Sequence, residues 1–172
     1  QALAEIAWKH GRPDRAQEHF SEAIATCEAY LQSSPNTLPI YCTLSGLQIA
    51  YGRFLFSQGN AEAHAAFSLA HTAAEEALQR APRNAQSTQQ KAIALLASGE
   101  FLEYSGKRES AIASYNEAIS CFNTVIRLGS EHAETHVLKC IAQYKIASLK
   151  FQTAEIVEAE SKLQSALSVI DS

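Results

Sequence analysis

Three side chains near residue 136 have types and spacing that suit a metal ion. His132, His136 and Cys140 follow one another at intervals of four residues. On a helix this spacing places side chains on one face, and imidazole with thiolate is a ligand set that zinc accepts. The stretch HAETH is not the HExxH of metalloproteases, however, and no fourth ligand can be identified. We expect no metal, and a zinc enzyme or zinc-binding module remains the least favoured hypothesis.

Two carboxylates, Glu100 and Glu103, are spaced to share a helix face and could act as an acid/base pair. Nothing nearby in the sequence would raise the pKa of either one, so a solvated pair is expected. The chain has no glycine-rich phosphate loop and no serine or cysteine nucleophile with an evident base. We therefore predict no catalytic residues, no cofactor and no enzymatic activity.

Composition limits the partners. The chain of 172 residues carries a formal net charge of -4, with acidic and basic residues intermixed. Nucleic-acid binding depends on clustered Lys and Arg, which are missing. No apolar run approaches the roughly 20 residues that cross a bilayer. The four cysteines lack metal or disulfide spacing and are expected to be reduced apolar fillers, which indicates a reducing, cytoplasmic location.

The elements that carry these residues are set by a repeat of 47 to 48 residues. Large side chains recur at Phe20, Phe67, Tyr115 and Leu163, and alanines recur three residues later at Ala23, Ala70, Ala118 and Ala166. Small residues recur upstream at Ala4, Gly52, Gly99 and Ala147, with Gly11, Gly59 and Gly106 between the two series. A fixed period in several residue types is typical of a stacked array of supersecondary units.

Apolar residues at helical spacing and Gly or Pro at the breaks predict an all-α chain. We expect eight helices, joined by alternating long and short turns as antiparallel hairpins, over residues 1–10, 14–32, 37–58, 61–80, 85–105, 108–128, 132–152 and 155–171. They form one domain, 1–172, with repeats of about 1–34, 35–82, 83–130 and 131–172. The small residues should let paired helices approach, and the large residues should fill the remaining space.

These residues resemble the tetratricopeptide repeat. GRPDRAQEHFSEAI (11–24) and GKRESAIASYNEAI (106–119) match its small residue, turn Gly, Ala, aromatic and Ala positions. The resemblance covers essentially the whole chain and implies a right-handed α-solenoid of four repeats. Two features depart from the usual pattern: the period exceeds 34 residues, and Thr153 and Ala154 stand where the fourth turn Gly would be. Long repeats of this kind are similar to those of bacterial signalling proteins.

The resemblance implies a protein-binding function, with a partner peptide or helix in a concave groove lined by the first helix of each hairpin. Helical phase then selects the groove residues Trp8, Lys9, Arg53, Phe56, Ser57, Glu100, Glu103, Tyr104, Tyr144, Lys145, Ser148 and Phe151. Core packing is the alternative for each aromatic ring, and a solvated helix face is the alternative for each charge.

Some relatives of this family hold a carboxylate terminus with basic residues at positions that correspond to Lys9, Arg53, Glu100 and Ser148. The acidic Glu100 interrupts such a clamp, so a mixed-charge partner is expected instead. The second hypothesis is self-association as a homodimer, because Leu163, Leu167 and Ile170 have no later helix to cover them in this sequence.

Overall fold

The computed structural model describes residues 1–129 and 132–170, with side chains for 1–129, 132–152, 156 and 157. Within these residues the chain is all-α, with no strand. It forms seven helices: α1 (Ala2–Lys9), α2 (Pro13–Ser33), α3 (Leu38–Ser57), α4 (Ala63–Arg80), α5 (Ala85–Tyr104), α6 (Arg108–Arg127) and α7 (Ala133–Ile170). Both ends of each of the first six helices agree with the sequence prediction to within two residues.

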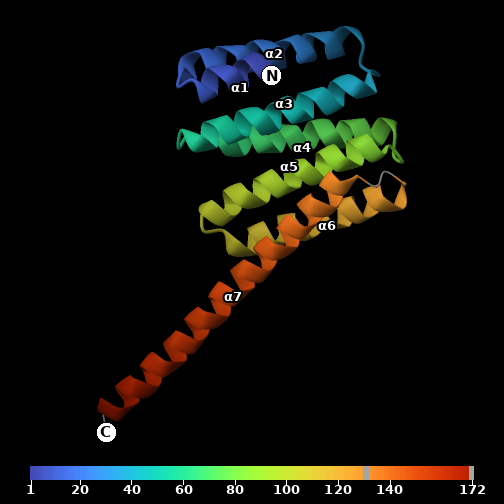
Figure 1. Cartoon of the computed structure of the whole chain (residues 1–172). Coiled ribbons are helices and arrows are strands. Elements are labelled where there is room, and N and C mark those ends of the chain that lie inside the picture. The colour runs from blue at the N-terminus through green and yellow to red at the C-terminus, as the bar shows by residue number, and fades with distance from the viewer. Residues whose placement is uncertain (130–131, 171–172) are drawn as a thin grey trace.

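The helices pack in chain order, each against the next, as in a helical repeat (Figure 1). Contacts also join α3 to α5 and α5 to α7, and the rings of Trp8 in α1 and Phe54 in α3 lie 5.7 Å apart. The odd-numbered helices therefore form one layer. Each even-numbered helix lies against the two odd-numbered helices that flank it in sequence.

Three of the short turns have the same structure, because each contains a Gly with positive φ. Gly11, Gly59 and Gly106 have φ of 66°, 68° and 72°. The amide after each Gly donates to a carbonyl in the last turn of the preceding helix, for example Lys107 N to Leu102 O at 2.9 Å. This is the Schellman arrangement, which ends a helix and lets the chain reverse.

The predicted eighth helix is wrong as a separate element. Helix α7 is continuous from Ala133 to Ile170 and extends beyond the other helices (Figure 1). The predicted turn fell at Thr153 and Ala154, where the chain has no residue that favours positive φ, so the helix continues. The side chains of Leu163, Ala166, Leu167 and Ile170, on which the repeat and the dimer hypothesis partly depended, lie outside the described residues.

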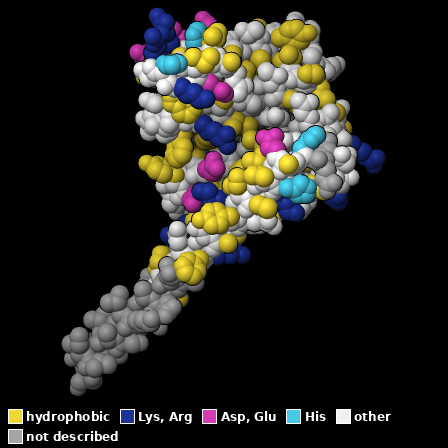
Figure 2. Space-filling view, viewed as in Figure 1, with side chains coloured by type: hydrophobic (Ala, Val, Ile, Leu, Met, Phe, Trp, Pro, Cys, Tyr) yellow, Lys and Arg dark blue, Asp and Glu magenta, His cyan; other side chains and the backbone are white. Residues whose placement is uncertain are grey.

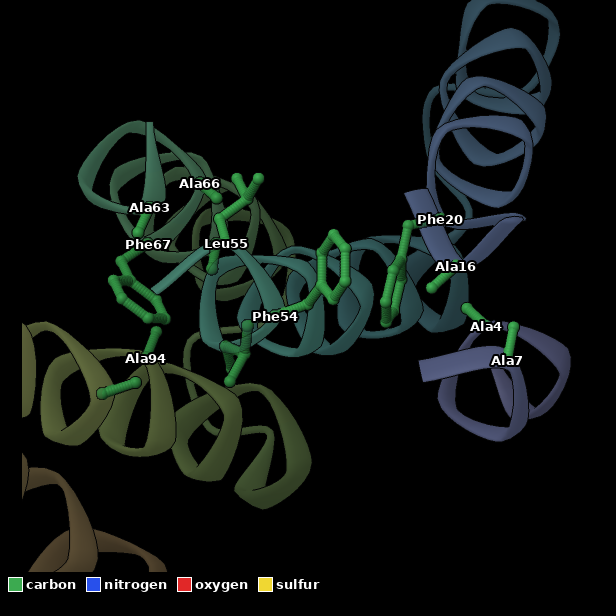
Figure 3. Close-up of a cluster of buried hydrophobic side chains, with 13 residues drawn as sticks. Ala4, Ala7, Ala16, Phe20, Phe54, Leu55, Ala63, Ala66, Phe67 and Ala94 are labelled. Carbon is green, nitrogen blue, oxygen red and sulfur yellow. The ribbon is translucent and has the colours of Figure 1, made fainter. Parts of the chain in front are cut away.

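The core confirms the predicted fit of small residues against large ones. Phe20, Phe67 and Tyr115 are buried, as are Ala4, Gly52 and Gly99. Figure 3 shows Phe20 pointing toward Phe54 and toward the alanines of α1, and Phe67 pointing toward Ala94 of α5. Ala147, the fourth small residue, is exposed, because α7 does not turn back to cover it.

Candidate functional site

The strongest candidate site is a cavity of about 280 Å³ between α1, α3 and α5. It brings together three predicted groove residues, Trp8, Lys9 and Arg53. Its other lining residues are Gln1, Glu5, Gly46, Ile49, Ala50, Gln90 and Ile93. We call this lining the odd-helix groove. It has an apolar base of isoleucine and alanine and a rim with both charge signs.

Sequence reasoning missed part of this lining, although helical spacing could have found it. Glu5 and Ile49 lie one turn before Lys9 and Arg53, and Ile93 lies two turns before Glu100. Ser45 and Gln48, by contrast, are buried within α3 and are not part of the lining. The residues that line the groove therefore lie nearer the starts of the odd-numbered helices than the residues that we predicted.

Charged residues on successive odd-numbered helices pair with one another. Arg53 Nη2 lies 3.9 Å from Glu100 Oε2, and the two side chains are 46% and 35% exposed. At that exposure the pair adds little stability, so both charges remain available to a partner. Figure 2 shows basic and acidic side chains following one another across this face, with hydrophobic side chains between them.

A second, deeper network surrounds Glu103. Its Oε2 accepts a hydrogen bond of 2.8 Å from Tyr115 Oη and one of 3.1 Å from Lys145 Nζ. Burial raises the pKa of Tyr115 well above its ordinary value, and the neighbouring Glu103 carboxylate raises it further. Glu103 thus joins α5, α6 and α7. Glu100 forms its ion pair with Arg53 and Glu103 forms its ion pair with Lys145, and the charges of both carboxylates raise the pKa of Tyr115.

The predicted aromatic residues divide between core and surface. Trp8 and Phe56 are half-buried, and the Phe56 ring contacts those of Tyr104 and Phe101 at 4.9 and 5.8 Å. Tyr104, Tyr144 and Phe151 are exposed. Trp8 and Phe56 therefore have packing roles as well as partly open faces, while Tyr104, Tyr144 and Phe151 leave most of their surface open to a partner.

The remaining predicted groove residues are spread along the same layer. Ser57 is exposed at the end of α3, where its hydroxyl donates to Phe54 O at 2.7 Å. Ser148 is half-buried on α7. Neither residue lines the cavity between α1, α3 and α5.

The three metal candidates are exposed on and just before α7. Among the residues whose side chains are described, no three His, Cys, Asp or Glu come together closely enough to hold a metal ion. The cysteines are free thiols: Cys42 is buried, Cys27 and Cys121 are half-buried, and Cys140 is exposed. Burial raises the pKa of both Cys27 and Cys121, which disfavours the reactive thiolate.

No protein-family model and no curated protein matches the chain. Within the described segments, no helix combines the length and the apolarity that a membrane crossing requires.

Proposed function

We propose that the chain is a non-catalytic scaffold that binds a segment of another protein in the odd-helix groove. In this proposal the helices form a right-handed α-solenoid of the tetratricopeptide type, and the odd-numbered helices form its concave side. The observation that carries the proposal is the cavity in which Trp8, Lys9 and Arg53 meet an apolar base. The likeness of the long repeats to those of bacterial signalling proteins favours a regulatory role in the cytoplasm.

The groove chemistry defines the partner. Lys9 and Arg53 attract a carboxylate, whereas Glu5 and Glu100 attract a cation, and Ile49 and Ile93 accept an apolar side chain. A peptide with an apolar anchor between residues of opposite charge satisfies all three requirements. A partner that presents only a terminal carboxylate would leave Glu100 facing a like charge.

Exchange of the paired charges tests this proposal. The double variant Arg53→Glu with Glu100→Lys keeps an ion pair between α3 and α5 but exchanges the positions of its two charges, so that each faces a like charge on the partner. Peptides of about 12 residues, selected from a random library by the wild-type protein, should bind this variant at least about tenfold more weakly. Fluorescence polarisation measures the affinity.

A matched control exchanges an exposed pair at the start of α6, Lys107→Glu with Glu109→Lys. This control should bind the selected peptides as the wild type does. Equal binding by the groove variant, or failure of the library to yield any peptide, would refute the groove assignment.

A second role, self-association, is favoured by one observation. Helix α7 carries the exposed side chains of Val137, Ile141, Tyr144 and Phe151 at intervals of four, three and seven residues, which place them on one face. An exposed apolar stripe of this kind marks an interaction surface, and a second copy of α7 would bury it symmetrically. Light scattering should then show a dimer, and Tyr144→Lys with Phe151→Lys should yield a monomer. A wild-type monomer at every concentration would exclude this role.

A further inference from the structure

A second cavity, of about 460 Å³, lies between α2 and α4 with α3 at its base. We call it the α2–α4 trough. From each of the three helices the lining runs from one residue to the residue seven positions later: 21 to 28 in α2, 48 to 55 in α3, and 62 to 69 at the start of α4, where Glu62 immediately precedes the helix. Seven residues of helix extend about 10 Å, so the trough is an elongated channel parallel to the helices.

The trough is apolar at its centre and acidic at its edges. The half-buried Ile24 and the 53%-exposed Leu69 provide apolar surface, Leu55 closes the base at 2% exposure, and Glu28 and Glu62 are exposed. None of the lining residues is basic. Among the described residues, neither carboxylate has an ion-pair partner. The trough therefore presents two unneutralised negative charges beside an apolar surface.

Gln48 contributes a polar group to the lining of the trough. It is only 5% exposed and lines the trough, yet no hydrogen bond to its side-chain amide is found among the described residues. Its amide atoms are not among the fully buried polar atoms that lack a partner, so they remain accessible from the trough. The Gln48 amide is thus placed to bond a polar atom of a bound molecule.

Between α4 and α6, the next pair of even-numbered helices, the chain neutralises its own carboxylates with a lysine. Lys91 of α5 extends between α4 and α6, where its Nζ lies 3.1 Å from Glu75 Oε1 and 3.0 Å from Glu117 Oε1. One repeat earlier the corresponding residues are Leu44, Glu28 and Leu69. The α2–α4 trough therefore keeps one carboxylate of the clamp but has neither its lysine nor its second carboxylate.

We infer that the α2–α4 trough binds an amphipathic helix of a partner protein, with its apolar stripe on Ile24 and Leu69 and with lysine or arginine beside Glu28 and Glu62. The partner's cation takes the place that Lys91 occupies in the following gap. The channel follows the direction of the three helices that line it, which suits a short helix laid in a groove. This site lies apart from the odd-helix groove and does not depend on the function proposed for it.

A synthetic peptide of about 14 residues tests the inference, with leucines at i, i+3, i+4 and i+7 and lysines on the flanking positions. Titrated into ¹⁵N-labelled protein, it should shift amide resonances in the three lining segments, 21–28, 48–55 and 62–69. The variant Glu28→Lys with Glu62→Lys should weaken binding at least about tenfold. A peptide with glutamate in place of every lysine should not bind.

Two controls separate this site from nonspecific attraction and from the odd-helix groove. Glu18→Lys reverses an exposed charge on α2 outside the lining and should change the affinity less than about twofold. The Arg53→Glu, Glu100→Lys variant should bind the lysine peptide as the wild type does. Shifts confined to the odd-helix groove, equal weakening by Glu18→Lys, or no binding would each overturn the inference.

Discussion

Single side chains decide how closely the helices approach. A Cβ added to Gly52 would lie 2.6 Å from Phe67 Cε1, and one added to Gly99 would lie 2.7 Å from Tyr115 Cδ1. Both distances are shorter than van der Waals contact, so neither position accepts a side chain while the aromatic ring keeps its place. These two glycines, each paired with one ring, set the spacing of the α3–α4 and α5–α6 hairpins.

We predict that Gly52→Ala and Gly99→Ala each lower the free energy of unfolding by about 1 to 3 kcal/mol, the usual effect of overpacking a core. Gly46→Ala is the matched control within α3. Its added Cβ would lie 3.8 Å from the nearest atom, Gln90 Oε1, so it should stabilise by up to about 1 kcal/mol through helix propensity. Urea denaturation measures all three, and destabilisation by Gly46→Ala alone would contradict the packing argument.

Lys91 is the residue whose contribution depends most clearly on pH. Burial opposes its charged form, yet its hydrogen bonds to Glu117 and Glu75 hold the Lys91 pKa above the ordinary 10.5. The hydrogen bond from Lys91 lowers the pKa of Glu75 below its ordinary 4.5. The Glu75 contribution is thus present above pH 4.5 and lost as the pH falls through the lowered pKa. The Lys91 contribution is lost only as the pH rises through the raised pKa.

Lys91→Met should therefore lower Tm relative to wild type between about pH 5 and pH 10, and the difference should shrink toward pH 3. The carboxylates are half exposed, so we expect about 0.5 to 1 kcal/mol at neutral pH, or a few degrees in Tm. Lys107→Met, at an exposed position, is the control and should have no pH-dependent effect. A constant difference across this range would show that the clamp acts through packing rather than charge.

At the scale of elements, the turn residue determines whether a hairpin forms. Gly106 ends α5 with φ of 72°, and a Cβ at this position would meet no atom within 4 Å. Glycine is therefore needed at position 106 for its backbone conformation and not because a side chain would clash. At the corresponding position of the fourth repeat, Ala154 keeps the helical conformation and α7 continues.

Gly106→Ala should lower the free energy of unfolding by about 1 to 2 kcal/mol, the free-energy difference that disfavours positive φ in residues with a Cβ. Gly106→Asn should have a smaller effect, because asparagine adopts this conformation more readily. Chemical denaturation of the two variants distinguishes them. Equal loss in both would contradict the backbone explanation.

At the scale of the whole molecule, stability is divided along the chain. One core cluster joins α1 to α5 and includes Phe20 and Phe67, and another joins α5 to α7 and includes Tyr115 and Phe122. Because helices contact mainly their neighbours, a defect at one end should be transmitted weakly to the other.

Phe20→Ala should remove about 3 to 5 kcal/mol of local stability and increase amide hydrogen exchange chiefly in α1, α2 and α3. Exchange in α6 should change much less, since its core residues belong to the other cluster. Phe122→Ala is the matched variant and should give the reverse pattern. Uniform loss of protection in both variants would show that the array unfolds as one cooperative unit.

Part of the candidate site could be predicted from the sequence, for reasons that are local. Helical phase selected Trp8, Lys9 and Arg53, which the cavity brings together. It did not select Gln90, which approaches them only because α5 packs against α3. Nor did it find the α2–α4 trough, whose lining comes from three helices that are brought together only by tertiary packing.

The sequence by itself determined the helical class, the first six helix boundaries and the small-to-large pairing, because spacing, Gly and Pro act within a few residues of each position. The tertiary structure alone decided that Glu103 binds Tyr115 and Lys145 rather than pairing with Glu100. It also showed that α7 runs straight past Ala154. The repeat in the sequence shows which residues occupy equivalent positions in successive helices. Contacts between helices depend in addition on how each helix is rotated and how closely it packs against its neighbours.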